Sequence, residues 1–142
     1  MSTVYGVNAT KVLDPTSENI CDPGELAGKV RVMTDTYEAA ALAAGSTIHI
    51  GQALPVGARI LDVILAFDAL GAATISVGDS SSTARYIAAT SVAAAGMVDM
   101  AEGDKVDGLL YEITADTDDI ILTTASAAIT GTVKVIIFYT CE

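Results

Sequence analysis

His49 is the only histidine in the 142-residue chain, so a Ser–His–Asp triad or any imidazole base would have to use it. It lies between Ile48 and Ile50 in an alternating segment, which predicts a β-strand with the ring on the face opposite the two isoleucines. The sequence contains no Gly-x-Ser-x-Gly nucleophile elbow. We therefore interpret His49 as a surface residue of a strand, and we expect no catalytic residues.

Two groups of acidic residues have a composition suited to cation binding or to glycoside hydrolysis. Segment 115–119 reads ADTDD, but its spacing does not match an EF-hand loop, and Ca²⁺ takes about six to eight oxygen ligands. We interpret this first group as a solvated turn, and we expect no metal ion and no cofactor. The second group offers paired carboxylates, as glycosidases do, but no aromatic sugar platform accompanies it; it comprises Asp99, Glu102, Asp104 and Asp107.

The segment Asp79–Arg85, with the sequence DSSSTAR, contains the hydroxyl groups of a phosphate-binding loop. It lacks the glycine framework and the lysine of a Walker loop. We interpret it as a polar hairpin loop.

Several segments alternate between apolar and polar residues, which is typical of half-buried β-strands. In RILDVILAF the alternation places Leu61, Val63, Leu65 and Phe67 on one face. Glycine and aspartate turn formers separate the segments, and we find no long helix. The predicted strands are TIHI (47–50), RILDVILAF (59–67), ATISVGD (73–79), LLYEIT (109–114), DIILTT (119–124) and TVKVIIFYT (132–140).

The alanine-rich run 86–103 has a helix-favouring composition but a poor helical period, so we predict short strands and a turn there. Strands that recur at short intervals favour a sandwich of about eight strands with a helix content below roughly 15%. The fold class that we predict is all-β: an antiparallel jelly-roll-like β-sandwich, formed by residues 37–142, with an extended N-terminal arm.

Some apolar residues point away from the predicted core: Ile60 and Ile64 in the first long strand, and Ile136 and Phe138 in the last. Strands that are apolar on both faces need cover on both faces. The chain's own arm or loops are one possible cover, and a neighbouring subunit is the other. We expect self-association through this face, as a homodimer or a homotrimer.

Residues 1–36 differ from the rest of the chain, because turn signals such as Asp14-Pro15 and Asp22-Pro23-Gly24 interrupt them and no period is sustained. The segment is nevertheless rich in apolar side chains, so we interpret it as an arm that is laid against a partner rather than as a frayed end. The residues expected at an interface are Val4, Tyr5, Val12, Leu13, Ile20 and Leu26 in the arm, and Ile60, Ile64, Ile136 and Phe138 in the strands.

The composition excludes several classes of protein. Hydrophobic residues make up 51% of the chain and the formal net charge is −11, which argues against disorder and against binding to nucleic acid or to an anionic membrane. Cys21 and Cys141 lie far apart in the sequence and match no zinc motif; we expect free thiols, and one long-range disulfide is the alternative. The first residues do not resemble a signal peptide, so we expect a soluble protein made in the cytoplasm.

The order of these segments resembles that of small head proteins of tailed bacteriophages, the decoration or cement proteins. The resemblance covers roughly residues 45–140, and its specificity lies in phrases rather than in a catalytic motif. It implies a jelly-roll-like sandwich that binds the outer surface of an assembled capsid, bridges major capsid subunits and has no active site. The phrases are GSTIHIGQALPVGARILDVILAFDALGAATISVGD, RYIAA, GLLYEITADTDDIILTT and GTVKVIIFYT.

We therefore expect a structural protein of the virion, located on the capsid exterior, whose partners are the major capsid protein and other copies of itself. A receptor- or glycan-binding fibre or tail domain is the alternative, but it would need exposed aromatic residues, and the chain has only five Tyr and two Phe. A small hydrolase is the third hypothesis, and the lone His49 disfavours it.

Overall fold

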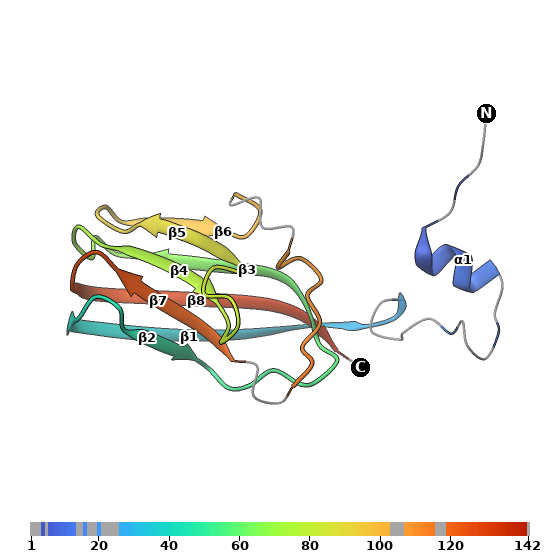
Figure 1. Cartoon of the computed structure of the whole chain (residues 1–142). Coiled ribbons are helices and arrows are strands. Elements are labelled where there is room, and N and C mark those ends of the chain that lie inside the picture. The colour runs from blue at the N-terminus through green and yellow to red at the C-terminus, as the bar shows by residue number, and fades with distance from the viewer. Residues whose placement is uncertain are drawn as a thin grey trace.

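The computed structural model describes residues 4, 6–13, 16, 20, 26–102, 107–115 and 119–141. Within them the chain forms eight strands and one short helix, which confirms the predicted all-β class (Figure 1). The elements are α1 (Val7–Leu13), β1 (Lys29–Leu42), β2 (Thr47–Ile50), β3 (Arg59–Phe67), β4 (Thr74–Gly78), β5 (Ile87–Ser91), β6 (Gly96–Asp99), β7 (Ile120–Ala125) and β8 (Ile129–Cys141).

The strands form two four-stranded sheets, with the orders β1-β8-β3-β6 and β2-β7-β4-β5. Neighbouring strands of both sheets pair antiparallel. Except for the β4–β5 hairpin, which stays within one sheet, each connection between consecutive strands crosses from one sheet to the other, as in a jelly roll. The first and last strands, β1 and β8, are also the longest, and they lie side by side.

The core lies between the two sheets and consists almost entirely of aliphatic side chains. Alternate residues of β3 point into it, and Val63, Leu65 and Phe67 face Ile137, Val135 and Val133 of β8. From the second sheet Ile75, Ile120 and Leu122 fill the other half. The alternation predicted for β2, β4, β7 and β8, and for β3 from Val63 onward, therefore matches the side chains that the sandwich buries.

β1 begins at Lys29, so the arm boundary expected at residue 36 falls inside a strand. Residues 29–36 pair with β8 in an unbroken register, from Lys29 opposite Cys141 to Thr36 opposite Lys134. The remaining described part of the arm is not wholly extended either, because it contains α1. This helix buries none of its residues, and Figure 1 shows it beyond the end of the sandwich.

The strand predicted at 109–114 is wrong. Residues 107–110 form a turn, and only Glu112 makes a β-bridge, to Arg59. Leu110 has a φ of 59°, in the left-handed region that breaks a strand. The alternating pattern here reflects Ile113, which is buried in the core, and Tyr111, which packs against it.

The alanine-rich run forms β5 and β6 with a turn between them, as predicted. Of the segments described, no helix is long and apolar enough to span a membrane.

Candidate interaction surfaces

The first candidate surface is the face of the β1-β8-β3-β6 sheet that points away from the core, which we call the outer face. Ile64, Ile136 and Thr34 are neighbours across three strands, and Phe138 lies beside Val32 at the next level. The structure thus brings together three of the residues expected at an interface: Ile64, Ile136 and Phe138. All three are half-buried by their neighbours within the sheet.

Exposed apolar side chains extend the outer face to both edges of the sheet. Val30 and Val32 on β1 are 61% and 53% exposed, and Met97 on β6 is 68% exposed. Asp62 and Lys134 lie beside this apolar centre. An apolar centre with a charged rim is the composition of a protein interface.

The expectation that Ile60 belongs to this face is wrong, because its side chain is completely buried in the core. The pairing between β3 and β8 shifts register between Ile60 and Asp62, so one extra residue, Leu61, is inserted there. A bulge of this kind reverses the face on which the preceding residues point. Ile60 therefore joins Val63 in the core, and Leu61 is only half-buried.

The second candidate surface is the arm. Its described apolar side chains are exposed in the isolated chain: Val4 is 86% exposed and Ile20 is 73% exposed, and Val12, Leu13 and Leu26 also lie in solvent. Tyr5 lies outside the described residues. The arm leaves the sandwich at Lys29, at the same end as the last residues of β8.

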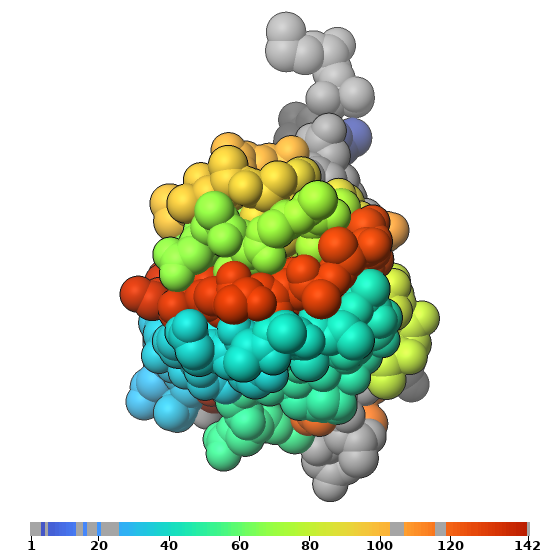
Figure 2. All heavy atoms as spheres, turned by 90° about the vertical axis from the view of Figure 1, so that its left-hand side faces the viewer, coloured from blue at the N-terminus to red at the C-terminus, as the bar shows by residue number. Residues whose placement is uncertain are grey.

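The third candidate surface is the opposite end of the sandwich, which we call the alanine end. It is made of the four turns 43–46, 68–73, 92–95 and 126–128, and Figure 2 shows these turns stacked beside one another. Most of their residues are alanine or glycine, and their only charged residue is Asp68. In a chain with a net charge of −11, this end with a single charged residue is a distinct surface that the sequence pattern did not reveal.

The polar loop 79–85 is a structural element. Asp79 is almost fully buried, forms an ion pair with Arg85 and accepts hydrogen bonds from the backbone N–H groups of Ser81 and Ser82. Burial alone would raise the pKa of Asp79, but the hydrogen bonds from Arg85, Ser81 and Ser82 outweigh burial and lower it. The guanidinium of Arg85 also stacks 4.0 Å above the ring centre of Tyr111. This cluster joins the loop to the segment 107–115.

The backbone of this loop approaches β4 closely, which explains Gly78. A Cβ atom at position 78 would lie only 1.9 Å from the carbonyl oxygen of Ser82. The interpretation as a polar hairpin loop agrees with the structure, because the polar groups of the loop form hydrogen bonds with one another.

His49 is exposed, as predicted, and its Nδ1 lies 3.1 Å from a carboxylate oxygen of Asp119. Among the described residues, no three His, Cys, Asp or Glu side chains are grouped to hold a metal ion. Asp104 and the segment 116–118, which belong to the two acidic groups, lie outside the described residues, and so does Cys21. Cys141 is a half-buried free thiol at the end of β8.

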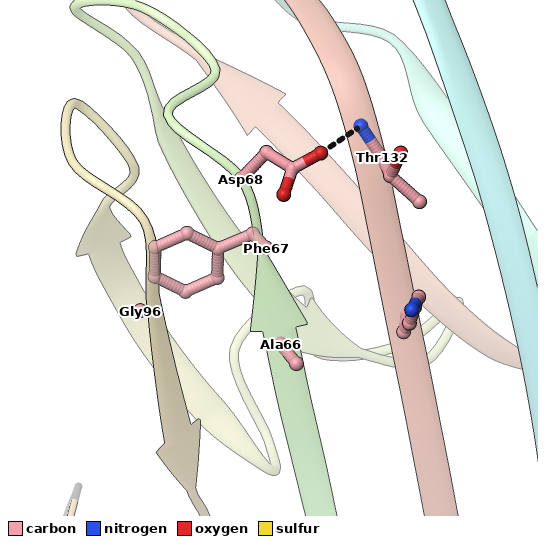
Figure 3. Close-up of a pocket in the computed structure, with 6 residues that line it drawn as sticks. Ala66, Phe67, Asp68, Gly96 and Thr132 are labelled. Carbon is pink, nitrogen blue, oxygen red and sulfur yellow. Dashed lines mark hydrogen bonds between the residues drawn. The ribbon is translucent and has the colours of Figure 1, made fainter.

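The described part of the surface includes two hollows. The smaller, of about 200 Å³, lies where β3 ends, and its lining includes Phe67, Gly96 and Asp68, whose carboxylate accepts a hydrogen bond from the N–H of Thr132 at 3.3 Å (Figure 3). The larger, of about 560 Å³, lies beside the start of β1, between Arg31, Tyr139 and the loop that carries Val56. Neither lining brings together a nucleophile, a base and an orienting group.

No protein-family model and no curated protein matches the sequence. Solved structures do match. A chain of the cyanophage Pam1 capsid asymmetric unit is 26% identical, with a TM-score of 0.65 over 81% of this chain and 86% of that chain. A chain of the capsid of Ralstonia phage GP4 is 24% identical, with a TM-score of 0.60 over 81% of this chain and 84% of that chain, and shows the same fold. The similarity to the cyanophage capsid chain supports the conclusion that this chain is a structural protein of a phage virion.

Proposed function

We propose that the chain is a head decoration protein of a tailed bacteriophage, which binds the outer surface of the capsid and bridges major capsid subunits. The observation that carries the proposal is the similarity to a phage capsid chain over most of both lengths. That chain is covered to 86%, so it too is a small protein built mainly of one such sandwich. A protein of this kind acts through its surfaces rather than through an active site.

The arm and the outer face are the surfaces that we assign to binding. Together they hold most of the large apolar side chains that the described part of the chain leaves exposed, among them Val32 and Met97, as well as the half-buried Ile136 and Phe138. Burial of one such side chain is worth roughly 1.5–3 kcal/mol. Ordering an extended segment costs about 1–2 kcal/mol per residue, so only the anchored parts of the arm stay ordered on the shell.

Bridging explains how modest contacts stabilise a head. A subunit or an oligomer that holds two capsid subunits at once gains from effective concentration, so its total affinity exceeds that of either contact. Separation of capsid subunits under the pressure of packaged DNA then requires the loss of these contacts as well. The net charge of −11 suits a position outside the shell, away from the phosphates of the genome.

The proposal is tested by addition of the purified chain to heads that lack it, followed by sedimentation and electron microscopy. We expect the chain to pellet with the heads at regular surface positions, and the decorated heads to release DNA at a higher temperature than bare heads. A chain that leaves heads bare but binds host cells would instead be a fibre or tail domain, and the proposal would be wrong.

A matched pair of variants identifies the binding face. Ile136→Glu puts a charge on the outer face, whereas Ile121→Glu puts the same charge on the far side of the other sheet; both isoleucines are half-buried. We expect Ile136→Glu to weaken head binding at least tenfold, which corresponds to about 1.4 kcal/mol, with little effect of Ile121→Glu. Equal effects of the two substitutions would contradict the assignment of the outer face.

A further inference from the structure

β1 is an edge strand of its sheet, and it is unusually long for one. It has 14 residues, and it pairs only with β8. Proteins protect such edges with proline, bulges or short strands, because an open edge pairs readily with another strand. β1 contains no proline, and its only register shift lies beyond Ala39. Residues 29–39 therefore form a regular strand with one side open.

The hydrogen bonds show which backbone groups face the open side. In an antiparallel ladder, the N–H and C=O of one residue point the same way, and those of the next residue point the opposite way. The N–H and C=O of Thr132 in β8 both bond to Asp68, on the β3 side. Val133 must then bond in the other direction, to Tyr37 of β1. The odd-numbered residues of β1 accordingly bond to β8.

The even-numbered residues, Val30, Val32, Thr34 and Thr36, thus present their N–H and C=O groups at the open edge. The hydrogen bond of the Thr36 N–H agrees with this, because it goes to the side chain of Asp35 at 2.7 Å rather than to β8. An edge with alternate free donors and acceptors offers one side of a complete antiparallel ladder.

The order of charges along β1 selects the partner. The first half carries Lys29 and Arg31, two of only seven basic residues in the chain, and the second half carries Asp35 and Glu38. A second copy of β1, running antiparallel, brings the basic half of each strand to the acidic half of the other. A parallel copy would place like charges together.

One register fits this complementarity best. With the two-fold axis at Met33, Arg31 faces the partner's Asp35, and Val32 faces the partner's Thr34. A two-fold axis at Val32 would shorten the paired segment. An axis at Thr34 would place Asp35 opposite Met33 of the second copy, with no charge to pair with. The Asp35 carboxylate already accepts the N–H groups of Thr36 and Gly51, each at 2.7 Å, but a carboxylate has about four acceptor positions, so it has room for a guanidinium.

We propose that the chain forms a two-fold dimer through β1, with the β1 strands of two copies paired antiparallel about Met33. The β1-β8-β3-β6 sheet of one copy and the same sheet of the other copy then form one continuous sheet across the axis. The outer faces of both copies, with Val32 and Phe138 nearest the axis, become a single apolar surface. The contact does not depend on the function proposed above, and it uses the same surface patch on both copies, as closed symmetry requires.

Cysteine pairing tests the register directly. In a Cys21→Ser/Cys141→Ser background, Val32→Cys protein is mixed with Thr34→Cys protein under mild oxidation. Directly opposite residues in a bonded pair lie about 5.5 Å apart at Cα, within disulfide range. Each variant alone is expected to stay uncrosslinked, because its own partner position is diagonal, at about 7–8 Å. The matched control, Val32→Cys mixed with Thr36→Cys, has the same diagonal geometry and should not crosslink.

Sedimentation equilibrium supplies an independent readout on the wild-type chain. We expect a dimer whose dissociation constant rises about tenfold or more on Arg31→Glu, because two attractive pairs become two repulsive ones. Lys29→Glu changes the charge equally but faces the partner's Tyr37, so its effect should be smaller. A monomer at high concentration, a trimer, or crosslinking of the control pair instead of the Val32–Thr34 pair would overturn the proposal.

Discussion

At the scale of single residues, the ion pair between the buried Asp79 and Arg85 links charge to the stability of the sandwich. Because its hydrogen bonds lower the pKa of Asp79, this group binds protons less readily in the folded chain than in the unfolded chain. Its contribution to stability is therefore fully present above the unfolded pKa of about 3.9, and it is lost as the pH falls through the lower folded pKa.

Asp79→Asn is accordingly expected to reduce the free energy of unfolding at pH 7 by about 1.5–3 kcal/mol, because hydrogen bonds to a charged acceptor are lost. The difference from wild type should shrink as the pH falls below about 4, because the unfolded chain then takes up a proton at Asp79 more readily than the folded chain does. Urea unfolding at several pH values measures this. Asp107→Asn, in an exposed turn, is the control. A difference that stays constant from pH 7 to pH 3 would contradict the mechanism.

The bulge in β3 makes a second prediction about single residues. Ile60 lies in the core, whereas Ile64 lies on the outer face, although the two differ by four positions in one strand. Ile60→Ala should cost about 2–5 kcal/mol of unfolding free energy, because it leaves a cavity, and Ile64→Ala about 1 kcal/mol. Thermal or urea unfolding of both variants gives the comparison. If the costs are equal, the register shift between Ile60 and Asp62 is misplaced.

At the scale of elements, the period of two was sufficient to predict β2, β3, β4, β7 and β8, because each buries one face in the core. It did not reveal β1, since β1 buries few of its side chains and its first four residues are all exposed. The period of two also could not show that one residue is inserted next to Ile60, because the residues around the bulge are apolar and their order does not reveal which face each one takes. The neighbours Ile64, Ile136 and Phe138 belong to β3 and β8, and only the strand order brings these two strands together.

The arm and β1 are separable elements, and truncation distinguishes them. Deletion of residues 1–26 removes α1 and leaves β1 complete, so we expect a folded sandwich with an unchanged midpoint of unfolding and much weaker binding to heads. Deletion of residues 1–35 also removes half of the β1 ladder, and it should lower the stability. Circular dichroism and head co-sedimentation measure the two effects. Unchanged head binding by the shorter deletion would show that the arm is dispensable.

At the scale of the whole molecule, the sandwich has two unlike ends. The arm, the start of β1 and the end of β8 lie at one end, together with the loop that carries Val56. The alanine end lies at the other, where the side chains are small and offer little surface to bury (Figure 2). A decoration protein that holds the shell by its arm brings the first end close to the capsid and leaves the alanine end farther away.

This orientation predicts the effect of peptide insertions. A short epitope inserted after Ala94, in the β5–β6 turn of the alanine end, should leave head binding nearly unchanged and stay accessible to antibody on decorated heads. The same epitope inserted after Val56, an exposed position at the end that carries the arm, should reduce head binding or be hidden once the chain is bound, because in the proposed orientation that end faces the capsid. Circular dichroism of both insertion variants establishes that each sandwich is folded before binding is compared. If the Ala94 insertion abolishes binding while the Val56 insertion has no effect, the sandwich meets the capsid through its alanine end, and the arm extends outward.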